Sequence, residues 1–72
     1  MTIEEKIELL EEMMDVDPGT LELDTVLDDV EEWDSLSKLS LIAEAKKNFG
    51  LVLQAEKLNT FTTVKDVCDF LG

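Results

Sequence analysis

Apolar residues recur three and four positions apart in this chain, and that spacing is typical of amphipathic helices. In the first such segment the recurring residues are Ile3, Ile7, Leu10 and Met14. No segment has the pattern of a strand. The chain has only 72 residues and one cysteine, so no disulfide framework can support it. We therefore expect a single all-α domain over residues 1–72 with a small core.

Capping and stop signals set the limits of the expected helices. The sequence TIEE at residues 2–5 fits a capping box with Thr2 as the N-cap. The turn sequence at residues 17–20, which contains proline and glycine, should stop this helix. We expect the second helix to run from Ser35 to Asn48 or Phe49, with Gly50 as the C′ residue. A short helical turn should follow at residues 55–58. The last helix should run from a cap at Thr62 or Thr63 to the end of the chain. The result is a four-helix bundle of three long helices and one short one, with a long first loop.

That long loop, roughly residues 17–33, is too apolar for a free linker. A loop of this length in a compact domain is usually functional or disordered, and apolar residues argue against disorder. We therefore expect it to pack across the helices. Its apolar residues are Leu21, Leu23, Val26, Leu27 and Val30.

The negative charge is confined to one half of the chain. Residues 1–35 hold 14 acidic residues and one lysine, whereas residues 36–72 hold four acidic residues and five lysines, which gives a net charge of −12. Such a charge excludes ordinary binding to nucleic-acid phosphates. The acidic half is either a solubilising face or a docking surface for basic partner proteins, and composition leaves both interpretations open.

The residue types that are missing exclude several kinds of site. Without histidine the chain cannot build a Ser-His-Asp or Cys-His catalytic site, nor, with one cysteine, a usual zinc site. A calcium loop starting at Asp15 would place Val26 at the bidentate position, so we expect no metal site. No apolar run reaches the length of a membrane span, and the acidic N-terminus is no signal peptide. We expect a non-catalytic protein in a reducing cytoplasm.

The tripeptide Asp34-Ser35-Leu36 lies where the acidic loop becomes the second long helix. Either Ser35 or Asp34 can cap the helix at that place. Ser35 can also be an exposed hydroxyl to which a group is attached. The two roles are compatible, and the residues alone do not choose between them.

Along nearly its whole length the chain resembles a free-standing acyl carrier protein. The resemblance rests on the first helix, the long acidic loop, Asp34-Ser35-Leu36, Phe49-Gly50 and the Thr-Thr-Val sequence at residues 62–64. It implies that Ser35 carries 4′-phosphopantetheine, attached by a separate phosphopantetheinyl transferase, and that Asp34 helps to dock this transferase. The thiol of the group would hold acyl intermediates as thioesters for acyl-loading and acyl-transfer enzymes. The carrier would be a monomer serving fatty-acid synthesis or a specialised acyl pathway.

Four residues near the serine are candidates for partner binding. Leu36, Leu39 and Ala43 match the stripe of the family that faces partner enzymes, although such a stripe can also pack in a core. Trp33 either packs the loop onto the domain or helps to shape the docking surface. Two alternative functions stay open: an aminoacyl or peptidyl carrier, such as a D-alanyl carrier, and a small helical interaction module without a prosthetic group.

The second long helix departs from the family in two ways. Members that serve general fatty-acid synthesis usually have an acidic helix there, whereas this chain has Lys38, Lys46 and Lys47 against the single acidic Glu44. This difference predicts a specialised carrier whose partners are less basic where they meet the helix. Ala45 also stands where a larger aliphatic residue is common, which predicts room for an acyl chain inside the bundle.

Overall fold

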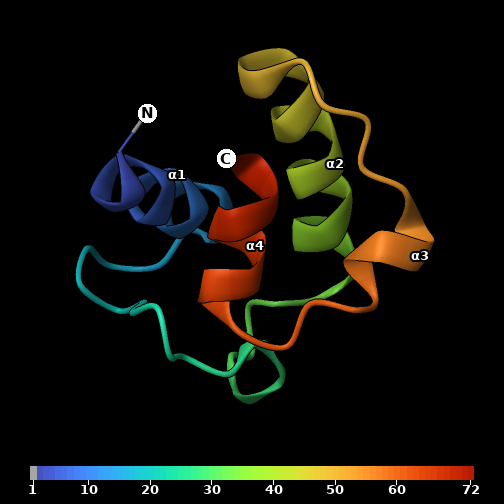
Figure 1. Cartoon of the computed structure of the whole chain (residues 1–72). Helices are drawn as coiled ribbons and strands as arrows, with labels where there is room; N and C mark the ends of the chain where they lie inside the picture. The colour runs from blue at the N-terminus through green and yellow to red at the C-terminus, as the bar shows by residue number, and fades with distance from the viewer. Residues whose placement is uncertain (1) are drawn as a thin grey trace.

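The computed structural model describes residues 2–72, and in this range it forms a small all-α bundle, as predicted (Figure 1). Helix α1 packs against both α2 and α4, and the short α3 lies at the edge of the bundle. In the described range no helix combines the length and apolarity needed to cross a membrane. The helices are α1 (Ile3–Met14), α2 (Ser35–Phe49), α3 (Ala55–Leu58) and α4 (Val64–Leu71), and a 3₁₀ turn (Leu27–Asp29) lies in the loop between α1 and α2.

Helix α1 begins as predicted and ends earlier than predicted. The amide of Glu5 donates to Thr2 Oγ1 at 3.2 Å, and the amide of Thr2 donates to Glu5 Oε1 at 2.9 Å, which completes the capping box. The helix stops at Met14 because Asp15 turns into the left-handed region, with φ of 58°. Aspartate is one of the few residues with a side chain that enter this region readily. The turn at residues 17–20 therefore follows the end of the helix and does not cause it.

The predicted limits of α2 are confirmed, and its C-terminus explains why. Gly50 takes a left-handed conformation with φ of 66°, and its amide donates to the carbonyl of Lys46 at 3.1 Å. The next amide, of Leu51, donates to the carbonyl of Ala45 at 3.1 Å. These two bonds satisfy carbonyls that the end of a helix leaves free, which is the reason glycine is common at this place.

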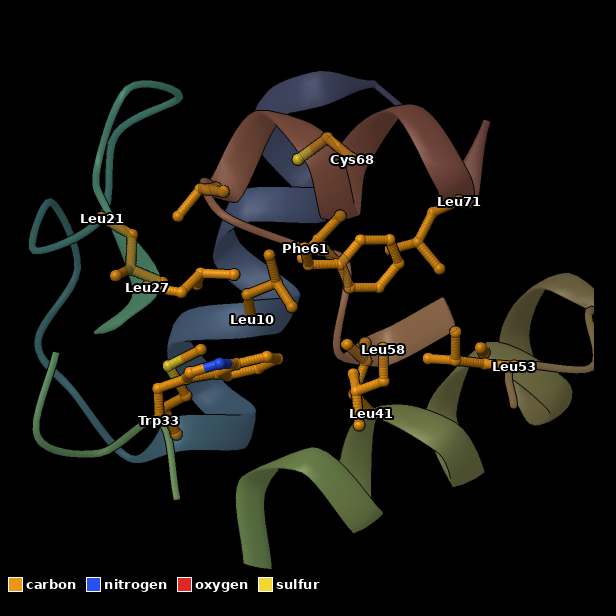
Figure 2. Close-up of a cluster of buried hydrophobic side chains, with 14 residues drawn as sticks. Leu10, Leu21, Leu27, Trp33, Leu41, Leu53, Leu58, Phe61, Cys68 and Leu71 are labelled. Atoms are coloured by element: carbon orange, nitrogen blue, oxygen red, sulfur yellow. The ribbon is translucent and has the colours of Figure 1, made fainter. Parts of the chain in front are cut away.

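One cluster of buried apolar side chains joins the helices to the long loop (Figure 2). Each large apolar side chain that is fully buried contributes about 1.5–3 kcal/mol. In a chain of this size the loop must therefore supply part of the core. The most enclosed side chains come from α1, the loop, α2 and α4: Leu10, Leu27, Leu41, Val64 and Val67.

The long loop is also held by its main chain, which the sequence did not predict. Residues 23–27 run beside residues 62–65 at the entrance to α4, and Val26 and Thr63 form an isolated antiparallel bridge. This pairing fixes the loop across one end of the bundle. Its bonds run from the amide of Leu27 to the carbonyl of Thr62 (2.9 Å), from Val64 to Thr25 (3.0 Å) and from Lys65 to Leu23 (2.9 Å).

A buried carboxylate ties the start of the loop to α1. Glu11 is only 4% exposed although it is charged. Its Oε2 accepts hydrogen bonds from the amides of Gly19 at 2.8 Å and Leu21 at 3.0 Å. Buried polar groups need such partners, and a carboxylate that accepts from amides makes strong ones.

Candidate functional site

Ser35 is the first residue of α2, and the structure separates it from the role of helix cap. The N-cap is Asp34, whose extended backbone has φ of −110° and ψ of −175°. Asp34 Oδ1 accepts a hydrogen bond from the amide of Ser37 at 2.9 Å. Because Asp34 already caps the helix, the hydroxyl of Ser35 is left for another role.

Among the three serines of α2, only Ser35 is exposed. Ser37 is 7% exposed, and its hydroxyl donates to the carbonyl of Glu32, which ties the helix back to the loop. Ser40 is half-buried. In the range that the structure describes, the hydroxyl of Ser35 has no hydrogen-bond partner. The exposed position at the helix start thus belongs to one hydroxyl.

The start of α2 also offers free main-chain donors. The amides of Ser37 and Lys38 are bonded to the side chain and the carbonyl of Asp34. Within residues 2–72, the amides of Ser35 and Leu36 have no such partner. Free amides and the helix dipole both favour a negative group at this end. A phosphodiester on the hydroxyl of Ser35 therefore fits the local chemistry, even though the preceding loop is acidic.

The exposed side of α2 begins next to Ser35. Leu36 is 73% exposed, Leu39 is 64% exposed and Ala43 is also exposed. Leu41 and Ala45, on the opposite side, lie in the core at 1% and 0% exposure. The alternative that Leu36, Leu39 and Ala43 pack in the core is therefore wrong. Apolar side chains left this open beside a candidate attachment point are typical of an interaction surface.

Trp33 packs the loop and does not lie on the exposed surface. Its side chain points into the core cluster, toward the side of the cluster that contains Leu10 (Figure 2), and the residue is 8% exposed. The ammonium of Lys38 lies 5.9 Å from the centre of its ring. The prediction that Trp33 packs the loop onto the domain is confirmed, and the alternative that it helps to shape a docking surface is wrong, because a large aromatic side chain gains more by burial. Burial of the Trp33 ring anchors the main chain directly before Asp34, and so fixes where α2 begins.

Cys68 offers no second site. Its side chain is 3% exposed on the inner face of α4. Burial raises the pKa of its thiol above the ordinary value. A buried thiol of raised pKa is a poor nucleophile, so Cys68 acts as a small buried hydrophobe.

Comparison with known proteins agrees with this geometry. A family described as "Phosphopantetheine attachment site" matches residues 7–71. Two curated proteins named "Acyl carrier protein", from the Twist and TW08/27 strains of Tropheryma whipplei, are each 29% identical over 56 residues, which is 78% of this chain and 68% of the relative. No solved structure matches the chain significantly.

The helical bundle and its family match define a carrier of a covalently attached prosthetic group, a class of proteins without catalytic activity of their own. The chain belongs to the acyl carrier protein family, and its prosthetic group is phosphopantetheine.

Proposed function

We propose that Ser35 carries 4′-phosphopantetheine and that the chain delivers acyl groups, held on that arm, to partner enzymes. The observation that supports this most strongly is the exposed hydroxyl of Ser35 at the first position of α2, with Asp34 acting as the cap. The attached group supplies a thiol that holds the acyl chain as a thioester. The protein supplies the attachment point and the surface that partners recognise.

The residues around Ser35 have distinct roles in this proposal. Ser35 is an acceptor and a tether, because the chain has no histidine that could activate it as a nucleophile. The base must therefore come from the phosphopantetheinyl transferase. Asp34 uses Oδ1 for the cap, which leaves Oδ2 to contact the transferase or its metal ion. Leu36, Leu39 and Ala43 form the apolar contact with partner enzymes.

Intact mass spectrometry tests the attachment. The apo-protein is incubated with coenzyme A, magnesium and a broad-specificity phosphopantetheinyl transferase, and the mass of the product is measured. We expect one phosphopantetheine adduct on the parent chain and on Ser40→Ala, the matched control in the same helix. We expect none on Ser35→Ala. Absence of an adduct with several transferases, or an adduct that survives Ser35→Ala, would favour a helical interaction module without a prosthetic group.

The pathway is a further part of the proposal. We propose a specialised carrier, because α2 bears Lys38, Lys46 and Lys47 where carriers of general fatty-acid synthesis are acidic. Steady-state kinetics with housekeeping fatty-acid synthase enzymes provide the test. A kcat/KM equal to that of an ordinary acyl carrier protein would contradict the specialisation while leaving the role of Ser35 intact.

A further inference from the structure

The exposed side of α2 has two chemically different ends. We define the α2 docking face as Leu36, Leu39, Ala43, Lys46 and Lys47, all of which are exposed. At 3.6 residues per turn these five positions fall within roughly 100° of the helix circumference. The face is thus apolar near Ser35 and cationic at its far end.

The cationic end is separated from the acidic loop by more than the range of their fields. With a rise of 1.5 Å per residue, Lys46 and Lys47 lie about 16–18 Å along the helix from Ser35. The screening length at physiological salt is only about 8 Å. A partner therefore meets two separate fields, negative beside Ser35 and positive beyond Ala43, where Lys46 and Lys47 outnumber the single carboxylate of Glu44, although the chain as a whole is strongly acidic.

The two lysines are also free to bind. In the part of the chain that the structure describes, the one ion pair joins Lys65 to Asp69 at 2.9 Å. Lys46 and Lys47 have no carboxylate within ion-pair distance there. Cations in the last turn also suit the helix dipole, but that benefit affects only the stability of the helix. An effect of these lysines on the binding of a partner would be separate from their effect on helix stability.

We propose that the enzyme which receives the acyl group binds along the α2 docking face with carboxylates over Lys46 and Lys47. An apolar patch would cover Leu36 and Leu39, and a basic rim would face the acidic loop beside Ser35. The carboxylates of the enzyme would lie about 16–18 Å from the entrance that admits the prosthetic arm. This inference rests on the proposed carrier function and adds the chemistry of the partner surface.

Two synthetic peptides serve as probes. Both are amphipathic helices with the same leucine stripe, and one has glutamates at one end where the other has lysines. Binding to the ¹⁵N-labelled apo-protein is followed by amide chemical shifts. We expect the glutamate peptide to shift the amides of residues 39–47, and the lysine peptide to shift those of residues 28–36.

Charge-reversed variants separate local contact from overall charge. K46E/K47E changes the α2 docking face, and K57E/K65E is the control of equal charge on exposed residues of α3 and α4, where it also breaks the exposed pair of Lys65 with Asp69. Each double variant lowers the net charge of −12 by the same four units. We expect the dissociation constant of the glutamate peptide to rise about five-fold in K46E/K47E, as when two exposed ion pairs are lost, and to change less than two-fold in K57E/K65E.

The remaining outcomes would overturn the inference. Equal weakening in both double variants would mean that only net charge matters. If K46E/K47E lost helix stability but bound the peptide unchanged, the two lysines would only stabilise the helix through its dipole and would not bind a partner. Because the peptides bind the apo-protein, these outcomes are independent of the attachment test, which reports separately on Ser35.

Discussion

Replacing Glu11 is expected to have the largest effect on stability of any substitution at an acidic residue of α1. Its carboxylate, 4% exposed, accepts hydrogen bonds from the amides of Gly19 and Leu21. Glu11→Ala leaves both amides without this partner. The amide of Leu21 lies in a buried environment and that of Gly19 in a partly buried one, so water replaces the carboxylate only in part.

The size of the effect follows from these two bonds. Hydrogen bonds to charged groups contribute about 1.5–3 kcal/mol each, and partial access of water to Gly19 lowers the sum to about 2–4 kcal/mol. A chain of 72 residues has a total stability of about 4–11 kcal/mol. Glu11→Ala should therefore remove a large fraction of it. Glu11→Gln keeps an acceptor oxygen but loses the charge, and should cost about 1 kcal/mol.

Urea denaturation followed by far-ultraviolet circular dichroism measures this loss. With a slope of about 1 kcal/mol per molar urea, the midpoint should fall by about 2–4 M in Glu11→Ala. Glu12→Ala is the matched control, because Glu12 is the exposed neighbour on the same helix and has the same charge. It should change stability by less than about 0.5 kcal/mol. Equal effects of the two substitutions would refute the argument, since the loss would then come from charge or helix propensity alone.

Four further predictions concern the core and the entrance to α4. Trp33→Ala should lower the free energy of unfolding by about 3–5 kcal/mol. A smaller loss, measured by urea denaturation, would show that the loop is not anchored by this ring. The amides of Thr62 and Thr63 hold the pKa of Asp66 below its ordinary value. The contribution of Asp66 to the stability of the fold is therefore present at neutral pH and is lost as the pH falls through that lowered pKa. Asp66→Asn should remove this part of the acid dependence of the melting temperature, and an unchanged dependence would contradict it. Burial of Cys68 and its raised pKa predict slow labelling by a thiol reagent until the chain unfolds, and rapid labelling of the native protein would contradict this. If the bundle opens beside the fully buried Ala45 to enclose an acyl chain, core chemical shifts should differ between short-chain and long-chain acylated forms, and equal shifts would exclude enclosure.

The helices could be predicted closely because their signals are local. A capping box involves residues three positions apart, and a C-terminal glycine acts within its own turn. The start of α1 and the limits of α2 were predicted on this basis and, like the short turn of α3, are confirmed. The early end of α1 was missed because nothing in the sequence marked Asp15 as the residue that enters the left-handed region.

The surroundings of the site were predicted less completely. The sequence placed Ser35 at the start of a helix, but it did not decide whether Ser35 or Asp34 caps that helix. The sequence favoured packing of Trp33 against the domain but left a surface role open, because an aromatic side chain serves in both places. The buried role of Glu11 gave no signal at all, since a glutamate in an acidic helix is ordinarily exposed.

By itself, the sequence determined which segments become helices, where the charges lie and which residue types are available for chemistry. The tertiary structure decided which side of α2 faces outward, that Asp34 and not Ser35 caps the helix, and that the loop pairs with the entrance to α4. The reason is the range of the interactions. Helix caps and spacing act over a few residues, whereas burial and main-chain pairing depend on segments that lie far apart in the chain and meet only when it folds.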